Sequence, residues 1–330
     1  MIRVGLIGNG KISDTHKAAY ARMPEVSLEV YCDANPENLK NLGDARTYTS
    51  VDEMLEKEQG KLDFVDICVP TFLHADITVK SLEKGFHVFC EKPMARTPEQ
   101  AQKMIDAAQR TGKTLMIGHC NRFFDPVLAI RETILSGEFG KVRSAEFSRE
   151  GQEHIGSFGV NSWFYNGELS GGGMLDTHIH DVDLIRWLFG KPKAVSAGAA
   201  PVYTKGGYDA MSVNYYYDDG LFVRASCDWT IANDKFNTRT MRVNFEKGYI
   251  FCDRTPGRVA FVKVAADGTE TDLSHLINVE FYYNELSYFI DCLNTGKPVE
   301  QCLPTQSKDA VEIIMAEMRS ADENGARIEV

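Results

Sequence analysis

The sequence has no apolar run of the roughly 18 residues that a membrane-spanning helix needs. It contains no internal repeat, low-complexity tract or disordered linker, which argues against a repeat protein. Basic side chains are fewer than acidic ones, with 36 Lys and Arg against 47 Asp and Glu, and the formal net charge is −11. Because phosphate contacts need basic patches, this balance argues against nucleic acid or an anionic membrane as a partner.

The eight cysteines show no CxxC spacing, and several lie inside apolar strands, where cysteine acts as a small hydrophobe. This pattern favours a reduced cytoplasmic protein over a disulfide scaffold. The amino terminus enters a predicted strand almost at once, so we expect no signal peptide. A length of 330 residues predicts two domains, and 43% hydrophobic with 25% charged residues is ordinary for a globular protein.

Up to about residue 120, short apolar strands alternate with segments of helical periodicity. Thr97 and Pro98 supply a cap and a first helical residue, and Gly112 supplies a stop signal. The alternation predicts an α/β domain over residues 1–120, with a parallel sheet that is covered on both faces. The expected strands are 3–7, 28–32, 64–69, 87–90 and 114–118, and the expected helices are 15–22, 73–84 and 98–111.

After a predicted helix over 126–135, strands follow one another without intervening helices. This change predicts a second, α+β domain over residues 121–330 with a large, mostly antiparallel open sheet. We expect the closing helix, over about 304–323, to pack back towards the first domain. The expected strands are 142–150, 194–204, 212–218, 221–231, 240–247, 249–253 and 258–264, and a further helix is expected near 281–294.

A glycine-containing loop follows the first strand and leads into a helix. Gly8 and Gly10 match the first two glycines of the Rossmann dinucleotide fingerprint, whereas Ser13 replaces the third. Asp33 at the end of the second strand is placed to bind the adenosine ribose, or alternatively to form the turn before Asn35, and it favours NAD over NADP. The predicted cofactor contacts of the loop are Gly8, Asn9, Gly10, Lys11 and Ile12.

Two further strands end in polar residues at the same expected sheet edge. Pro70, Thr71 and His74 are predicted cofactor contacts, although Thr71 could equally cap a helix and His74 could be a structural histidine. Glu91 and Lys92 follow the strand over 87–90. Because open parallel sheets bind ligands at the carboxyl ends of their strands, we predict that Glu91 and Lys92 contact the cofactor and that Lys92 is catalytic.

The segment 171–188 holds the densest group of ionisable residues, and a glycine-rich loop leads there into a predicted buried helix. Asp176 and His180 are four residues apart and share one face of a helix, so the carboxylate can orient the imidazole as a general base requires. A zinc or iron site is the competing interpretation, but HExxH and a clear third-ligand motif are lacking, and we predict no metal. Capping and packing are the alternative roles for His178, Asp181 and Asp183.

Taken together, the glycine loop, Glu91-Lys92-Pro93 and the segment from Gly171 to His180 resemble the Gfo/Idh/MocA family (glucose-fructose oxidoreductase and inositol dehydrogenase). The resemblance covers nearly the whole chain and implies a Rossmann domain followed by an open, mainly antiparallel sheet. It implies that Lys92 is the catalytic lysine and that Asp176 and His180 are the aspartate–histidine pair. Ser13 and His178 depart from the commoner family patterns.

The resemblance implies an NAD-dependent dehydrogenase that oxidises a secondary alcohol of a sugar, cyclitol or related polyol. His180, oriented by Asp176, would accept the hydroxyl proton and Lys92 would bind the reacting oxygen, although these two roles could be exchanged. Two alternatives are an NAD-retaining enzyme that cleaves glycosides by transient oxidation and elimination, and a sensor that binds the dinucleotide without turnover. We also expect a homo-oligomer, a dimer or a tetramer.

Five further side chains are predicted to contact the ligands. Asn121 and Arg122 are expected beside the nicotinamide of the cofactor. Trp163 could stack on a sugar face or belong to a core. The predicted substrate contacts are His154, Trp163 and Thr177.

Overall fold

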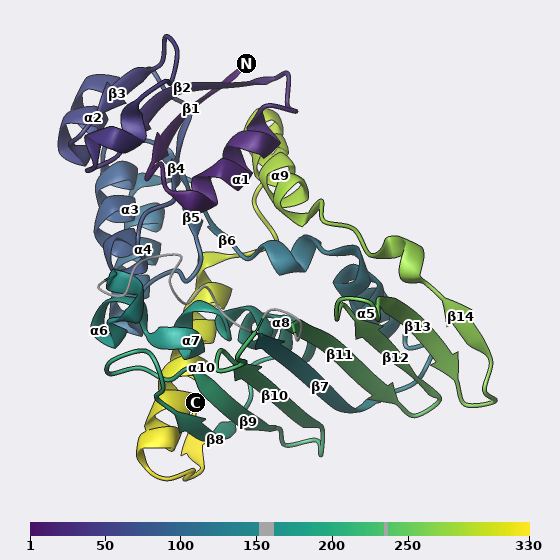
Figure 1. Cartoon of the computed structure of the whole chain (residues 1–330). Helices are drawn as coiled ribbons and strands as arrows, with labels where there is room; N and C mark the ends of the chain where they lie inside the picture. Colours follow the sequence, from purple (N-terminus) through teal and green to yellow (C-terminus); the bar gives the residue numbers. More distant parts are fainter. Residues whose placement is uncertain (152–161, 234–236) are drawn as a thin grey trace. The chain divides into compact units, whose positions relative to one another are not determined.

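The computed structural model describes residues 1–151, 162–233 and 237–330 (Figure 1). These residues form two compact units. Unit 1 comprises Met1–Cys120 and Glu280–Lys308, and unit 2 comprises Asn121–Val279 and Asp309–Val330. The chain passes from unit 1 to unit 2 after Cys120, and Glu280–Lys308 returns to unit 1.

Unit 1 contains a six-stranded parallel sheet in the order β3-β2-β1-β4-β5-β6. This strand order is that of the Rossmann fold, and it confirms the predicted doubly covered parallel sheet. The short strand β3 was not predicted, because two of its three residues are exposed and polar and give no apolar signal. The strands are β1 (Ile2–Ile7), β2 (Val26–Cys32), β3 (Arg46–Tyr48), β4 (Phe64–Ile67), β5 (His87–Glu91) and β6 (Leu115–Gly118).

Helices cover both faces of this sheet (Figure 1). Helix α1 (Lys11–Tyr20) packs beside α9 (Phe281–Thr295), and α3 (His74–Glu83) packs beside both α2 (Val51–Glu58) and α4 (Pro98–Thr111). The ends of α4 are those that the sequence predicts. The Thr97 hydroxyl accepts a hydrogen bond from the Gln100 amide at 3.3 Å. Gly112, with φ of 66°, ends the helix in the left-handed conformation.

Unit 2 contains a nine-stranded sheet in the order β14-β13-β12-β11-β7-β10-β9-β8-β15. Strands β7 and β10 pair in parallel and the other pairs are antiparallel, which confirms a mostly antiparallel sheet. The strands are β7 (Val142–Gly151), β8 (Ala194–Ala200), β9 (Ala210–Tyr216), β10 (Phe222–Asp228), β11 (Asn237–Phe245), β12 (Gly248–Asp253), β13 (Ala260–Ala265), β14 (Glu270–Asp272) and β15 (Ile328–Glu329).

Helices cover one face of the nine-stranded sheet (Figure 1). The inward residues of β9 and β10 are buried and alternate with more exposed outward residues, as expected of a sheet that is covered on one side. The Ser320 hydroxyl of the closing helix accepts a hydrogen bond from the amide of Ala197 in β8. The helices of unit 2 are α5 (Asp125–Ser136), α6 (Gly167–Ser170), α7 (Gly172–Asp176), α8 (Ile179–Phe189) and most of α10 (Pro304–Asp322).

The closing helix α10 is divided between the two units. Its first turn, through Lys308, belongs to unit 1, where Lys308 donates to the Gln102 side chain of α4 at 2.9 Å. Asp309 pairs with Arg186 of α8 at 2.6 Å in unit 2. The segment that returns to unit 1 therefore holds α9 and the first turn of α10.

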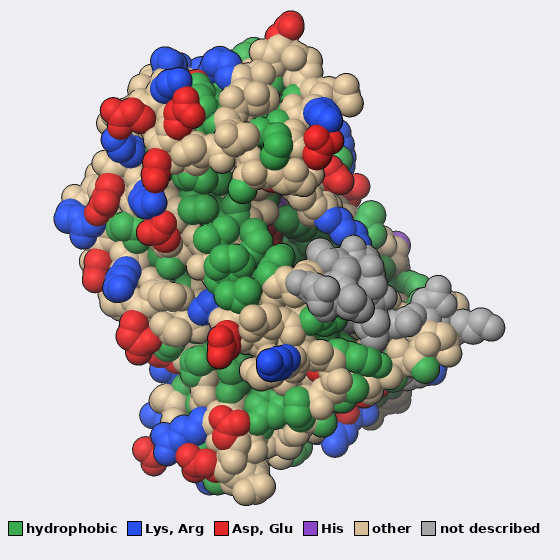
Figure 2. Space-filling view, turned by 60° about the vertical axis from the view of Figure 1, so that its left-hand side comes forward, with side chains coloured by type: hydrophobic (Ala, Val, Ile, Leu, Met, Phe, Trp, Pro, Cys, Tyr) green, Lys and Arg blue, Asp and Glu red, His purple; other side chains and the backbone are tan. Residues whose placement is uncertain are grey.

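On the face that Figure 2 displays, Lys and Arg side chains are interspersed with Asp and Glu side chains over the described residues. No helix among the described residues is long and apolar enough to cross a membrane. The mixed surface is in keeping with the excess of acidic over basic residues in the sequence.

Candidate active-site residues

The glycine loop lies between β1 and α1 and is shaped by two glycines with different tasks. Gly8 has φ of 93°, and a Cβ there would lie 2.6 Å from the backbone carbon of Cys68, so no larger residue fits. A Cβ on Gly10 would meet nothing within 4 Å, which leaves open space at the N-terminus of α1. That combination suits the approach of a pyrophosphate to a helix N-terminus.

Ser13, which stands in the place of the third glycine, stabilises the loop through its side chain. Its side chain is fully buried, and its hydroxyl donates a hydrogen bond of 2.6 Å to the Gly10 carbonyl. The same hydroxyl lies 3.2 Å from the Asn9 side-chain oxygen, which also accepts a bond from Lys17. The serine therefore closes the loop from within, and the departure from the fingerprint leaves the turn intact.

Asp33 follows β2 and is tied to the glycine loop. Its Oδ2 accepts hydrogen bonds from the Asn9 amide at 2.8 Å and from the Asn38 side chain, and its Oδ1 accepts one from the Asn35 amide. The turn-forming role that we considered is therefore present. The same contacts hold the carboxylate beside the loop, where the Rossmann pattern places the ribose-binding acid.

Glu91 and Lys92 lie at the carboxyl end of β5, and a cis peptide bond joins Lys92 to Pro93. Lys92 is half-buried, whereas Glu91 is 4% exposed. One oxygen of Glu91 accepts a hydrogen bond from the Lys92 backbone amide at 3.1 Å. The other oxygen lies 3.0 Å from Nε2 of His16. The carboxylate of Glu91 thus points into the protein, where it fixes the backbone of the lysine.

His16 connects this strand end to a second buried carboxylate. Its Nδ1 lies 2.8 Å from Asp66, which also accepts a hydrogen bond from the Tyr20 hydroxyl, and His16 and Asp66 are fully buried. Burial lowers the pKa of His16, but Asp66 and Cys68 together outweigh that effect, and the pKa is raised well above its ordinary value. The site therefore favours the imidazolium form of His16 between the two carboxylates.

Glu285 of α9 adds a further acid to the same region of unit 1. It is fully buried, and neither of its oxygens has a hydrogen-bond partner among the described residues. Burial, reinforced by the Glu91 carboxylate, raises its pKa well above the ordinary value, so its side chain is protonated in the fold. The cluster of His16, Asp66, Glu91 and Glu285 thereby avoids a third buried negative charge.

His16, Asp66 and Cys68 also form a possible set of metal ligands within the described residues. Burial raises the pKa of the Cys68 thiol, which disfavours the thiolate that a metal requires. The imidazole is already hydrogen bonded on both nitrogens. The three side chains are therefore explained as buried groups that hydrogen bond to one another.

The structure supports the structural alternative for His74. Its two ring nitrogens face the carbonyl oxygens of Pro93 and Val69, at 2.7 and 2.8 Å, and the side chain is buried. Burial lowers its pKa below the ordinary value. His74 therefore links the end of β4 to the loop after Lys92, and Thr71 beside it is also buried.

In unit 2, the glycine-rich segment is helical and not the expected loop. Gly171, with φ of 84°, ends α6, and α7 begins at Gly172. A Cβ on Gly172 would lie 2.9 Å from the backbone of Tyr208, so this close packing requires glycine.

Asp176 and His180 are both half-buried, but they do not lie in one continuous helix as predicted. Asp176 ends α7, and His180 is the second residue of α8. The intervening turn is tight, since the His180 amide donates to the Thr177 carbonyl at 3.2 Å, and the Thr177 hydroxyl donates to Asp176 at 3.3 Å. The break in the helix lies between the two predicted catalytic residues.

Arg122 is fully buried, and its guanidinium makes a two-pronged ion pair with Asp183 at 2.8 and 2.5 Å. The pair fastens the start of unit 2 to α8. His178 is likewise buried, with Nε2 3.1 Å from the Tyr215 hydroxyl.

Lys11 and Ile12 begin α1 and Pro70 follows β4 in unit 1, whereas two further predicted contacts lie in unit 2. Asn121 is 9% exposed and lines a small pocket. Trp163 is half-buried, and its ring packs edge-on against Phe164 with centroids 5.7 Å apart. His154 lies outside the described residues.

Comparison with known protein families finds one family model that matches most of the first 120 residues and a second that matches part of unit 2. A family model described as "Oxidoreductase family, NAD-binding Rossmann fold" matches residues 2–119, and the "GFO/IDH/MocA C-terminal domain" matches residues 127–251. The chain belongs to the Gfo/Idh/MocA family. This result confirms the resemblance, the oxidoreductase class and NAD as the cofactor.

Individual members of the Gfo/Idh/MocA family match over most of their length. The chain is 31% identical to inositol 2-dehydrogenase of Rhizobium meliloti over 322 residues, which cover 90% of each protein. It is 28% identical to D-glucoside 3-dehydrogenase of Escherichia coli K12, across 100% of this chain and 97% of the relative. A solved levoglucosan dehydrogenase in complex with NADH shares the fold, with a TM-score of 0.87 at 21% identity, and the match covers 100% of this chain and 99% of that one.

Sequence reasoning missed the buried partners of the family's Glu-Lys-Pro motif. His16 lies in α1, and its position carried no signal of its own because a histidine in an amphipathic helix looks like any other polar residue. Asp66 did carry a signal, since an aspartate inside an otherwise apolar strand must find a partner when it is buried. That signal could have led to His16 and Tyr20.

Proposed function

We propose that this member of the Gfo/Idh/MocA family is an NAD-dependent dehydrogenase of a secondary alcohol in a sugar, cyclitol or related polyol. The proposal rests mainly on the residues that lie at the carboxyl edge of the parallel sheet in unit 1. There the glycine loop, Asp33 and Lys92 follow the carboxyl ends of β1, β2 and β5. The carboxyl edge is where open parallel sheets bind dinucleotides and place reactive groups.

The residues of unit 1 fit the cofactor. Gly10 leaves space at the N-terminus of α1 where the loop from Gly8 to Ile12 would hold the pyrophosphate, and Asp33, fixed by the Asn9 amide, would hold the ribose. When it is bound, NAD supplies the hydride acceptor, and the protein supplies orientation and electrostatics. Thr71 and Pro70 contribute to the same edge after β4.

Lys92, Asp176 and His180 handle the oxygen and the proton of the alcohol. In our proposal His180, oriented by Asp176, accepts the hydroxyl proton, and the Lys92 ammonium hydrogen bonds to the oxygen as negative charge develops. Glu91 acts indirectly, because its carboxylate holds the Lys92 backbone at 3.1 Å. Trp163 and Thr177 are the proposed substrate contacts.

Purified protein with NAD and a panel of sugars and inositols, followed at the absorbance of NADH, tests this proposal. We expect Lys92→Met and His180→Asn each to lower kcat about 100-fold or more, the usual contribution of acid–base catalysis, while NAD affinity stays within a few-fold. The exposed Lys103→Met is the matched control and should retain full turnover. Full turnover of Lys92→Met would contradict the role of the lysine.

Product analysis separates this reaction from its alternatives. An enzyme that cleaves glycosides by transient oxidation would form sugar products without net NADH, and a sensor would bind NAD and form neither. Accumulation of one ketone per NADH supports the dehydrogenase.

We also propose a cytoplasmic homo-oligomer, a dimer or a tetramer. All eight cysteines are free thiols, which supports a reducing compartment. The outward face of the nine-stranded sheet exposes Phe222 and Tyr249 at 48% and 39%, which supports pairing between copies. Light scattering on the purified chain tests the assembly, and a monomer at micromolar concentration would contradict it.

A further inference from the structure

His178 lies at the junction of α7 and α8, between Asp176 and His180, two of the proposed catalytic residues. Its backbone joins the two helices. The amide of His178 donates to the Gly173 carbonyl of α7 at 2.9 Å, and its carbonyl accepts a hydrogen bond from the Asp181 amide of α8 at 2.9 Å. Its side chain is fully buried, and the proposed reaction gives that side chain no role.

Two side chains from elements distant in the sequence hold the ring of His178. Its Nε2 lies 3.1 Å from the hydroxyl of Tyr215 in β9 and 3.4 Å from a carboxylate oxygen of Glu317 in α10. These three residues, here called the His178 cluster, are fully buried and all belong to unit 2. Burial, reinforced by the Glu317 carboxylate, raises the pKa of Tyr215 well above its ordinary value, so the hydroxyl keeps its proton.

Other contacts already attach α10 to unit 2. Asp309 pairs with Arg186 of α8 at 2.6 Å, and the Ser320 hydroxyl accepts a hydrogen bond from the Ala197 amide of β8 at 2.8 Å. Apolar side chains of α10 between these two contacts are buried. Because apolar side chains of similar volume often stabilise a fold as well as buried charged groups do, docking of the helix does not explain a buried glutamate at position 317.

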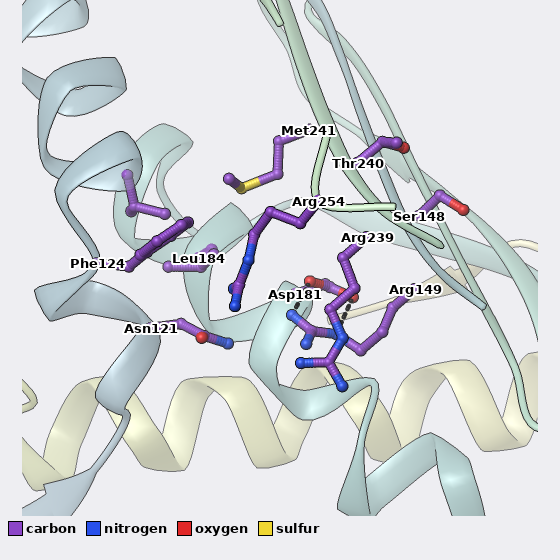
Figure 3. Close-up of a pocket in the computed structure, with 11 residues that line it drawn as sticks. Asn121, Phe124, Ser148, Arg149, Asp181, Leu184, Arg239, Thr240, Met241 and Arg254 are labelled. Carbon is purple, nitrogen blue, oxygen red and sulfur yellow. Dashed lines mark hydrogen bonds and ion pairs between the residues drawn. The ribbon is translucent and has the colours of Figure 1, made fainter. Parts of the chain in front are cut away.

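The acids that follow His178 in α8 are bound by other partners. Asp181 makes a two-pronged ion pair with Arg149 of β7 at 3.1 and 2.8 Å, at the pocket that Figure 3 shows. Asp183 makes its ion pair with Arg122. These pairs hold the first turns of α8, whereas the His178 cluster holds the residue that joins α8 to α7.

We propose that His178 and Glu317 are positioning residues: Glu317 fixes the imidazole of His178, and His178 fixes the junction that orients Asp176 and His180. The inference rests on the proposed function for the roles of Asp176 and His180. A buried ring with polar partners on two other elements restricts the rotation of the residue whose backbone joins the helices. Such orientation matters, because a misplacement of about 1 Å can cost on the order of 100-fold in rate.

Steady-state kinetics of the full chain with NAD and an accepted polyol measure the effect. Glu317→Leu removes both carboxylate oxygens at similar volume, and we expect kcat to fall about tenfold or more while KM and NAD affinity stay within about threefold. Glu317→Gln keeps an acceptor oxygen and the shape of the side chain, so it should recover most of the turnover. Glu323→Leu, which replaces an exposed glutamate just after the same helix, is the matched control and should leave kcat unchanged.

A double-mutant cycle separates positioning from a general loss of stability. If the His178 cluster acts through Asp176 and His180, Glu317→Leu should lower kcat less than about twofold once Asp176→Asn is present, because residues that act as a unit are not additive. A defect that is only structural would multiply with Asp176→Asn. If Glu317→Leu does not fold, Tyr215→Phe removes one hydroxyl from the cluster and should lower kcat about threefold or more, with the same loss of additivity.

Hydrogen exchange tests the junction without turnover. We expect the amides of His178, His180 and Asp181 to exchange about tenfold or more faster in Glu317→Leu, or in Tyr215→Phe if that variant replaces it, while the strands of the sheet are unchanged. Faster exchange supports the inference even if no polyol reduces NAD, in which case only the dehydrogenase proposal fails. Unchanged exchange at these amides overturns the inference. In an active enzyme, an unchanged kcat or a loss of kcat that multiplies with Asp176→Asn also overturns it.

Discussion

Replacing His16 by alanine tests whether the buried cluster holds the catalytic strand end in place. The substitution removes the cation between Asp66 and Glu91, which are 0% and 4% exposed. Asp66 keeps the hydrogen bond from the Tyr20 hydroxyl, and Glu91 keeps the hydrogen bond from the Lys92 amide. Asp66 also keeps the hydrogen bond from the Cys68 thiol at 3.5 Å, and both carboxylates lose their charged partner.

The magnitude follows from the cost of a buried charge without a partner. Removing one member of a buried ion pair typically costs about 3–5 kcal/mol. A domain of this size loses about 2–4 °C of melting temperature per kcal/mol, so we expect unit 1 to melt about 6–20 °C lower. We also expect kcat to fall, because Glu91 no longer fixes the backbone of Lys92.

Circular dichroism melting and NADH kinetics measure the two effects. The exposed His275→Ala is the control and should lie within about 0.5 kcal/mol of the natural protein. Adding Asp66→Asn to His16→Ala should recover part of the lost stability, because it removes the stranded charge. A His16→Ala protein that melts within 2 °C of the natural one, or a double variant that is less stable than the single one, would refute this reasoning.

Three further predictions concern other parts of the site. Gly8→Ala should destabilise the fold and abolish NAD binding, whereas Gly10→Ala should melt normally and lose only NAD affinity, because its Cβ enters the open space; calorimetry and melting curves distinguish them. Arg122→Lys should lower the free energy of unfolding by about 2 kcal/mol or more in urea titrations, since lysine cannot make the two-pronged bond to Asp183. Glu285 has a pKa raised well above its ordinary value of 4.5, so the folded state keeps a proton that the unfolded state loses, and stability falls as the pH rises above about 4.5. Glu285→Gln should flatten that fall, and melting at pH 5 and pH 8 would contradict us if both proteins changed equally.

Much of the fold was predictable because local signals and topology agreed. Helix α4 has a cap, a first-turn proline and a terminal glycine, and its ends coincide with the prediction. The apolar strands of unit 1 and seven of the nine strands of unit 2 were predicted from the sequence. Strands β3, β14 and β15 and helix α2 were missed, since two or three largely exposed residues and a short polar helix give weak patterns.

The candidate site was predictable where it depends on strand ends. Asp33 and Lys92 directly follow strands, and parallel strands bring their carboxyl ends to one edge whatever the details of packing. The ion pair of Arg122 with Asp183 was not predicted, because an arginine after a strand end looks the same whether its guanidinium faces a ligand or a buried carboxylate. No local sequence pattern shows which of these partners the guanidinium contacts, because the partner depends on the position of α8.

The small pocket of unit 2 that Asn121 lines is also lined by three arginines, and their convergence depends on the alignment of strands that are far apart in the sequence (Figure 3). Arg149, Arg239 and Arg254 occupy one level of the sheet because β7 and β11 pair in the observed register and β12 follows β11. A shift of one residue between β7 and β11 would turn Arg239 to the outer face and remove it from the pocket. The positive charge that lines the pocket thus depends on the register between β7 and β11. The bulge between Asn244 and Phe245 lies at the other end of this strand pair, away from the arginines. The lining of this pocket therefore depends on strand pairing as well as on the residues themselves.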